Sequence, residues 1–383
     1  MELYIHIPFC VRKCQYCSFV SFPASETQKD EYIDAVLKEA EIRKNEFDEP
    51  VETIYIGGGT PSLLSHQQFT RLTDGLQKTV SFQDVSEFSV EVNPGTVSEK
   101  FLQAASIAGV NRLSVGMQSA DESILRLLGR IHTYGDVETT LELARKNHIQ
   151  NLNLDLIFGI PGQTEEGWKE TVLAAVTLNP NHISAYGLIP EEGTPLYENL
   201  QNGRLILPEP EAERRMYDTA LLQLQNAGYN QYEVSNFSKT GFECRHNIGY
   251  WEQIPYVGLG ISAASMRIAE HNTSGMICVR RTNPESLEKY YTMLSGNNES
   301  SAATETIGFR ESRFETVMLA LRMNRGISRK RFMELHGAEI ETCYGPQLMK
   351  MEKAGMMKLE NECWSLTRKG MDIQNSILVE FMD

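Results

Sequence analysis

Residues 10–17 read Cys10-Val-Arg-Lys-Cys14-Gln-Tyr-Cys17, with three cysteines in the spacing C-x3-C-x2-C. This spacing places three thiolates in one short loop, whereas a structural zinc site and a ferredoxin-type [4Fe–4S] cluster each take four protein ligands. Three cysteines on a four-iron cluster leave one iron open, and an open iron can bind and polarise a small molecule. The spacing therefore predicts a [4Fe–4S] cluster held by Cys10, Cys14 and Cys17.

Two other uses of these cysteines are weaker. A disulfide pair with a spare thiol is disfavoured, because the chain opens without a charged and apolar leader and is expected to be cytoplasmic. Zinc is an alternative if His6, in the strand-like stretch Tyr4–Cys10, supplies a fourth ligand. The remaining cysteines share no ligand spacing and are expected to be structural: Cys244, Cys278, Cys343 and Cys363.

Composition limits the classes of function. The 383 residues carry a net charge of −15, which argues against nucleic acid as a general partner. No apolar run approaches the roughly 20 residues of a membrane span, so any membrane contact is expected to be peripheral. A chain of this length can bury a large core and is expected to form more than one domain.

Six short apolar segments alternate with helical patterns over the first half of the chain, which predicts a parallel sheet covered by helices. Six β/α units are too few for a closed eight-fold barrel, so we expect an open, partial (β/α)6 barrel in an α/β fold. The predicted strands are Leu3–Pro8, Thr53–Gly57, Glu87–Val92, Arg112–Met117, Asn151–Phe158 and His182–Leu188.

The pattern changes after about residue 190. We expect an amphipathic helix at Pro208–Gly228, irregular and strand-like structure at Tyr232–Ser265 and an exposed connection at Ser295–Thr304. Three helices and a hairpin at Met357–Thr367 then suggest a winged-helix-like module. The predicted organisation is a core (1–235), an α+β extension (236–305) and a C-terminal domain (306–383). This last region is almost balanced in charge, so packing or partner contact is expected for it rather than DNA binding.

Polar features follow the ends of successive predicted strands, where α/β folds place their sites. Gly57-Gly-Gly-Thr-Pro61 ends the second strand, and its glycines are expected to let a ligand approach backbone N–H groups. Glu91 closes the third strand, Gln118 closes the fourth, and Arg130 follows twelve residues later. Asp155 lies within the apolar fifth strand and must find a partner there.

The order of these motifs resembles the radical S-adenosylmethionine (SAM) proteins, and among them the anaerobic coproporphyrinogen III oxidase family, over most of the chain. The resemblance implies that SAM binds the open iron and is cleaved to a 5′-deoxyadenosyl radical. It also implies a SAM site lined by Tyr4, Gly58, Gly59, Thr60, Glu91, Gln118, Arg130 and Asp155. On this hypothesis Arg130 pairs with the methionine carboxylate. Glu91, Gln118 and Asp155 take the ammonium and ribose groups, and Tyr16 lies against the adenine.

Two features indicate the haem-chaperone branch of that family. The oxidase carries a further cysteine two residues after its third cluster cysteine, where this chain has Phe19. His246-Asn-Ile-Gly-Tyr-Trp251 matches the H-N-x-x-Y-W motif of the chaperone branch, which makes His246 a candidate haem ligand. From residue chemistry alone, a packed histidine beside core aromatics is the more frequent case. Ala264 stands where relatives of this branch commonly carry a histidine.

The function expected from the resemblance is a cytoplasmic haem chaperone that binds a [4Fe–4S] cluster, SAM and haem. It would transfer haem to acceptor proteins, and neither the acceptor nor an electron donor can be named from the sequence. The alternative is a radical SAM enzyme acting on a tetrapyrrole. It would be an oxygen-independent coproporphyrinogen III oxidase, which Phe19 disfavours, or a radical haem methyltransferase that opens the macrocycle.

Overall fold

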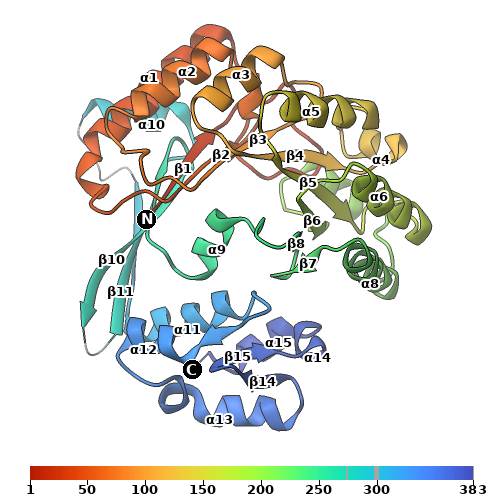
Figure 1. Ribbon diagram of the computed structural model, residues 1–383, viewed down its shortest axis with the longest axis vertical. Coiled ribbons are helices and arrows are strands. Elements are labelled where there is room, and N and C mark those ends of the chain that lie inside the picture. The colour runs from red at the N-terminus through yellow and green to blue at the C-terminus, as the bar shows by residue number, and fades with distance from the viewer. Residues whose placement is uncertain (273–274, 297–301, 383) are drawn as a thin grey trace.

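Six parallel strands lie side by side in chain order and form the predicted partial barrel (Figure 1). The computed structural model describes residues 1–272, 275–296 and 302–382. Every predicted strand is present with its limits within one residue. The strands are β1 (Glu2–Ile7), β2 (Thr53–Gly58), β3 (Glu87–Val92), β4 (Arg112–Gln118), β5 (Asn151–Phe158) and β6 (His182–Gly187).

Helices between the strands cover the outer face of this barrel (Figure 1). Several begin with a side-chain cap: Ser25, Ser65 and Thr133 each accept from a backbone N–H of the first turn in a capping box. Apolar residues from helices and strands form one continuous core. The helices are α1 (Glu26–Ile42), α2 (His66–Leu76), α3 (Glu99–Ile107), α4 (Glu122–Leu127), α5 (Tyr134–Lys146), α6 (Glu165–Thr177), α7 (Pro195–Gln201) and α8 (Pro210–Asn226).

The sheet continues beyond the barrel at both edges. At one edge β9 (Tyr256–Leu259) pairs parallel with β1, and three antiparallel strands follow: β10 (Ala264–Asn272), β11 (Gly275–Thr282) and β12 (Ala303–Ile307). At the other edge β8 (Asn236–Ser238) pairs with β6, and β7 (Asn230–Gln231) pairs with β8. The extension is therefore part of the same sheet as the barrel.

The segment between the two edges contains a helix that the sequence pattern did not predict. Within the stretch expected to be irregular and strand-like, α9 (Arg245–Trp251) carries the H-N-x-x-Y-W motif. It lies between the barrel and the C-terminal part of the chain, and it contacts β2 and α11 (Phe309–Ala320) (Figure 1). The exposed connection expected at residues 295–304 falls largely outside the described residues.

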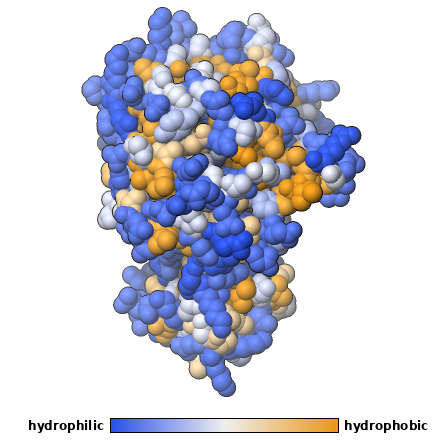
Figure 2. Space-filling model, turned by 90° about the vertical axis from the view of Figure 1, so that its right-hand side faces the viewer, coloured by the Kyte–Doolittle hydropathy of each residue, from blue (hydrophilic) through white to orange (hydrophobic). Residues whose placement is uncertain are grey.

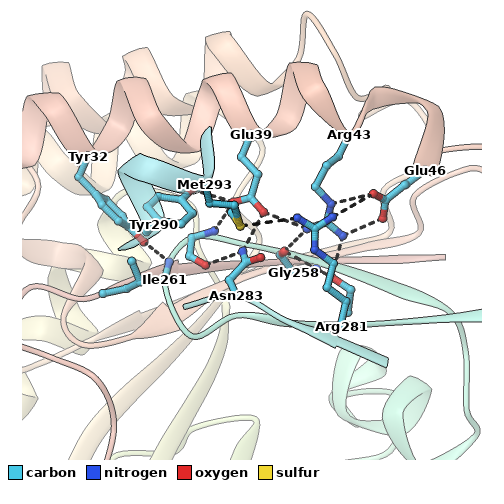
Figure 3. Close-up of polar contacts among 12 residues, drawn as sticks. Tyr32, Glu39, Arg43, Glu46, Gly258, Ile261, Arg281, Asn283, Tyr290 and Met293 are labelled. Carbon is cyan, nitrogen blue, oxygen red and sulfur yellow. Dashed lines mark hydrogen bonds and ion pairs between the residues drawn. The ribbon is translucent and has the colours of Figure 1, made fainter. Parts of the chain in front are cut away.

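A buried polar network joins α1 to the extension (Figure 3). Glu39, which is 1% exposed, accepts from Arg43 (3.0 Å), Asn283 (2.7 Å) and Tyr290 (2.7 Å), and also from the Gly260 N–H (2.8 Å). Tyr290 belongs to α10 (Leu287–Ser295), and Asn283 follows β11. Because a buried charge is tolerated only when it is paired and hydrogen-bonded, this network fixes the position of the extension on the barrel.

About the last fifth of the chain has a hydrophobic core of its own, formed by residues from Val317 to Phe381. Its helices are α11, α12 (Arg329–His336), α13 (Ile340–Lys353), α14 (Arg368–Met371) and α15 (Gln374–Val379). Its small sheet has the order β13 (Ile327–Ser328), β15 (Cys363–Leu366) and β14 (Met357–Glu360). The predicted helices and hairpin are present, and the comparison with a winged helix and the three-part domain division stay predictions.

The surface on the side of α6 and α8 is mainly hydrophilic, with separate apolar patches on the larger part of the molecule (Figure 2). Such a face agrees with the strong negative charge of the chain. Among the described residues, no helix has both the length and the apolar character needed to cross a membrane.

Candidate cofactor site

The cysteine loop is tied to the barrel at several points. At its base the Cys10 N–H donates to the Phe22 carbonyl (3.1 Å), and the Phe22 N–H donates to the Pro8 carbonyl (2.8 Å). At its middle the Gln15 N–H donates to the Leu128 carbonyl (2.9 Å). These bonds hold the loop over the carboxyl ends of the strands, where the sequence predicts the site.

A cavity of about 430 Å³ opens between this loop and the strand ends, and we call it the first cavity. It is lined by eleven of the thirteen site residues that were predicted from the sequence. These are Cys10, Cys14, Tyr16, Cys17, Gly58, Gly59, Thr60, Glu91, Gln118, Arg130 and Asp155. Tyr4 and His246 do not line it.

The glycine stretch after β2 has a different role from the one expected. Its N–H groups are not free for a ligand: Gly58 donates to Glu91 (2.9 Å), Gly59 to the Ile7 carbonyl (2.8 Å) and Thr60 to the Phe9 carbonyl (2.7 Å). A Cβ at Gly59 would lie 2.8 Å from those same two carbonyl oxygens. The glycines therefore allow the base of the cysteine loop to pack directly against β2.

Glu91 is a carboxyl group held below the glycine stretch. One oxygen accepts from the Tyr55 hydroxyl (2.9 Å) and the other from the Gly58 N–H (2.9 Å). Burial raises the pKa of Glu91 to about 7, and the nearby charge of Asp155 raises it further, while the two hydrogen bonds oppose this rise. A cation placed beside Glu91 would lower this pKa and favour the carboxylate form.

Gln118 and Arg130 lie together at the end of β4. Gln118 has a φ of +64°, a left-handed conformation that is uncommon for a residue other than glycine, and the pairing register with β5 shifts at this point. The Arg130 guanidinium donates to Asn93 (2.5 Å) and to the Gly116 carbonyl (2.8 Å) and lies 3.7 Å from the Cys14 sulfur. Its buried Nε has no partner among the described residues.

Asp155 has the partners that a carboxylate inside an apolar strand requires. It accepts from Ser114 (2.8 Å) and from Asn153 (2.8 Å). The Asn153 side-chain oxygen in turn contacts His182 Nδ1 (2.6 Å), and His182 Nε2 contacts the Tyr232 hydroxyl (2.8 Å). A continuous polar network thus forms the floor of the first cavity under β4, β5 and β6.

The donor set of the first cavity fits an iron–sulfur cluster. Three thiols reach the same cavity, and the unpartnered Arg130 Nε is buried beside them. In the described ranges, no group of three or more His, Cys, Asp or Glu side chains is placed to hold a single metal ion. Three cysteines that line one cavity match the number of thiolates that the proposed cluster needs from the protein.

His6 and Tyr4 face away from the first cavity. His6 Nδ1 contacts the Tyr4 hydroxyl (3.1 Å) and His6 Nε2 contacts the Val20 carbonyl (2.9 Å). Both residues line a second cavity of about 550 Å³ on the other side of the loop. His6 is therefore not placed as a fourth zinc ligand, and the structure leaves Tyr4 apart from the other predicted SAM residues.

His246 is a buried histidine with both ring nitrogens hydrogen-bonded. Nδ1 contacts the Thr53 hydroxyl (2.7 Å), Nε2 contacts the Tyr250 hydroxyl (3.0 Å), and the residue is 1% exposed. Burial lowers the pKa of His246 to about 3. The geometry favours the packed-histidine alternative over a haem ligand. The aromatic pair of the motif, Tyr250 and Trp251, lines the second cavity instead.

Several residues of the first cavity were missed by the sequence analysis. Asn93 connects Arg130 to the Thr60 hydroxyl (2.6 Å), and Tyr55 bonds Glu91. Asn93 lies in Glu91-Val-Asn-Pro94, so its place just after a strand was a usable signal. Tyr55 lies inside an apolar strand and carried no such signal.

Comparison with known proteins agrees with this site. The Radical SAM superfamily model matches residues 4–175, and the HemN C-terminal domain model matches residues 310–373. The coproporphyrinogen III oxidase structure from Escherichia coli superposes with a TM-score of 0.82 over 99% of this chain and 89% of that chain, at 23% identity. Fold, cysteine loop and first cavity together define a radical SAM protein.

Relatives that match this chain over nearly its full length show which family of radical SAM proteins it belongs to. The chain is 35% identical to the haem chaperone HemW of Bacillus subtilis over 99% of this chain and 98% of the relative. It is 32% identical to HemW of Lactococcus lactis over 99% and 96%, respectively. The chain belongs to the HemW haem chaperone family.

Proposed function

We propose that this protein is a cytoplasmic haem chaperone that carries a [4Fe–4S] cluster, binds SAM and haem, and delivers haem to acceptor proteins. The observation that carries the proposal is the first cavity, in which three cysteines meet Glu91, Arg130 and Asp155. Likeness over full length to proteins named haem chaperones supports the haem part.

Cys10, Cys14 and Cys17 would hold the cluster, which supplies an open iron and an electron to a bound sulfonium. Arg130 keeps its guanidinium beside Cys14 through Asn93 and Gly116, so its unpartnered Nε can take a carboxylate in the same place. Glu91 and Asp155 present acceptor oxygens to an ammonium and to hydroxyl groups. Gly59 and Thr60 position the loop, and Tyr16 packs beside Leu128 at its edge.

The test separates a haem carrier from a radical enzyme on a tetrapyrrole. Anaerobically reconstituted protein is titrated with SAM by calorimetry and with haem by its Soret absorbance. It is then incubated with SAM, reductant and coproporphyrinogen III. We expect saturable binding of both ligands and no protoporphyrinogen. Formation of protoporphyrinogen, or haem absorbance that never saturates, would overturn the proposal.

A further inference from the structure

The cysteine loop also has an outer side, where an open hollow of about 300 Å³ lies between the loop, α4 and α7. Within the described residues the hollow shares no lining residue with either cavity. Gln15 is the part of the loop that lines it: the Gln15 N–H donates to the Leu128 carbonyl (2.9 Å), and the Gln15 carbonyl accepts from the Leu196 N–H (2.9 Å). The loop therefore separates the hollow from the first cavity, which Cys14 and Cys17 line.

The surface around this hollow is basic, although the chain as a whole has a net charge of −15. Arg126 and Arg204 line the hollow, and no acidic side chain of the described residues does. Arg12 and Lys13 are exposed on the same loop. Among the described residues, Arg12, Lys13 and Arg204 form no ion pair, and Arg126 has only an exposed pair with Glu122 at 3.4 Å. We call these four cations, Arg12, Lys13, Arg126 and Arg204, the basic patch.

Apolar side chains next to the basic patch give this surface the character of a protein contact. Ile206 lies just beyond the hollow in the chain and is 78% exposed. Leu127 and Leu205 belong to the lining of the hollow itself. Protein interfaces combine an apolar centre with a polar rim, and charges at the rim set the rate and the orientation of encounter. A partner with carboxylates around an apolar contact would therefore match this surface.

The position of the basic patch against the cysteine loop indicates the task of that partner. Each electron that a cluster passes to a bound sulfonium must be replaced by a donor, and an electron moves readily only over a short distance. A donor at the hollow would be separated from the cysteines by the loop alone. The negative charge of the rest of the chain disfavours the approach of an acidic donor to other faces.

We propose that the basic patch docks an acidic protein that carries single electrons, with Gln15 between this donor and the cluster. The proposal rests on the proposed function, because the electron needs a cluster on the cysteine loop to accept it. The donor loses one electron and the cluster gains it, so no bond forms or breaks and no proton moves. Carboxylates of the donor would pair with Lys13 and Arg204 and take the place of Glu122 at Arg126. Since an exposed ion pair contributes little, this exchange costs little.

The first experiment measures docking without electron transfer. Anaerobically reconstituted protein is titrated by calorimetry with an oxidised flavodoxin, an acidic flavin protein. We expect Lys13→Glu and Arg204→Glu each to weaken binding about tenfold at low salt, with wild-type affinity falling as salt rises. The matched control is Lys78→Glu, an exposed position just after α2, which changes the net charge by the same amount. Equal affinities in Arg204→Glu and Lys78→Glu would overturn the proposal.

The second experiment separates docking from the properties of the cluster. The rate of cluster bleaching is followed with reduced flavodoxin and with photoreduced deazaflavin, a small uncharged reductant. We expect Arg204→Glu to slow the first reaction about tenfold and to leave the second at the wild-type rate. Equal slowing with both reductants, or wild-type protein that accepts electrons from deazaflavin but not from flavodoxin, would refute the docking site. Protein that holds no reducible cluster would instead refute the proposed function.

A lipid surface is the other partner that a basic patch beside an apolar side chain could contact. Flotation with vesicles of phosphatidylcholine and phosphatidylglycerol tests it on the same variants. We expect Arg204→Glu and Lys78→Glu to behave alike in this assay. Loss of vesicle binding in Arg204→Glu with unchanged affinity for flavodoxin would assign the patch to a membrane and overturn the proposal.

Discussion

The two cavities on either side of the cysteine loop are built in opposite ways. The first is polar and its key groups stand at the ends of β2, β3, β4 and β5, which are neighbours in one parallel sheet. The second combines aromatic rings with charged side chains and takes its walls from elements as distant as β1 and α11. Its shape therefore depends on how the extension and the C-terminal part pack on the barrel. The first cavity is lined by the barrel and its loops, with Asn247 of α9 as the one lining residue from the extension among the described residues.

This difference separates two tasks in one molecule. The first cavity presents charged groups that are held in place by hydrogen bonds within the protein, which suits a polar ligand held in one orientation. The second presents aromatic rings, one arginine (Arg280) and two glutamates (Glu285 and Glu315). The changes at Cys14 and Arg130 below are expected to affect the first cavity and spare the second.

Cys14→Ser should have the largest effect, because an alkoxide does not replace a thiolate on iron. We expect anaerobically reconstituted protein to lose the cluster absorbance and nearly all bound iron while the chain stays folded by circular dichroism. The control is Cys363→Ser, in β15 and away from both cavities, which should keep wild-type iron content. Full iron loading of the Cys14 variant would contradict the cluster assignment.

Arg130→Lys should have the next largest effect. Lysine keeps the charge but lacks the planar guanidinium group that bonds Asn93 and Gly116 and keeps its Nε available for a carboxylate. SAM affinity should therefore fall about 10- to 100-fold. Iron content should not change. Arg126→Lys, four residues earlier on α4 and paired at the surface with Glu122, is the control in the same calorimetric titration. Unchanged SAM affinity in Arg130→Lys would remove Arg130 from the site.

The sequence was enough to predict the first cavity because parallel strands bring their carboxyl ends to one edge. Glu91, Gln118 and Asp155 could therefore be placed near the cysteines from the strand pattern alone. The same reasoning was wrong about the glycine N–H groups, since the strand pattern does not tell which backbone groups the cysteine loop will use. Gly59 and Thr60 bond β1 and the loop, a contact between segments 50 residues apart.

The second cavity could not be predicted in this way. Phe19, Trp251 and Ala264 were each noticed in the sequence for separate reasons, but nothing in their spacing shows that they share one space. They meet because β9 pairs with β1 and because α9 is a helix. Glu87 of β3 accepts from the N–H groups of Arg245 and His246 at the start of that helix (3.0 and 3.2 Å), a long-range cap that no local pattern reports.

Glu2→Gln tests the buried layer beneath α9. Burial raises the pKa of Glu2 to about 9 from an ordinary 4.5, so folded protein keeps a proton that unfolded protein releases. Stability should therefore fall as pH rises through this window, by up to about 1.4 kcal/mol per pH unit. The melting temperature of Glu2→Gln should exceed that of the wild type by more at pH 8 than at pH 5.

The matched control for Glu2 is Glu52→Gln, at the exposed position just before β2, which should follow the wild-type pH dependence. Equal pH dependence in wild type and Glu2→Gln would mean that Glu2 is ionised in the folded protein. Burial is the cause that favours the neutral form of Glu2: the Thr53 hydroxyl donates to one carboxyl oxygen (3.3 Å) and opposes the rise in pKa, while the other oxygen has no hydrogen-bond partner among the described residues.

Phe19→Ser should have the smallest effect and is the sharpest comparison of the two cavities. Phe19 is 64% exposed and lines both, so its loss should change stability by no more than about 0.5 kcal/mol. Because an exposed aromatic ring can pack against a flat macrocycle, haem affinity should fall about threefold, while SAM affinity, which depends on polar contacts, should not change. Val11→Ser, at a position 55% exposed that lines only the first cavity, should leave haem affinity alone. A loss of haem affinity in Val11→Ser but not in Phe19→Ser would place the haem on the first cavity, because the two residues differ in which space they border.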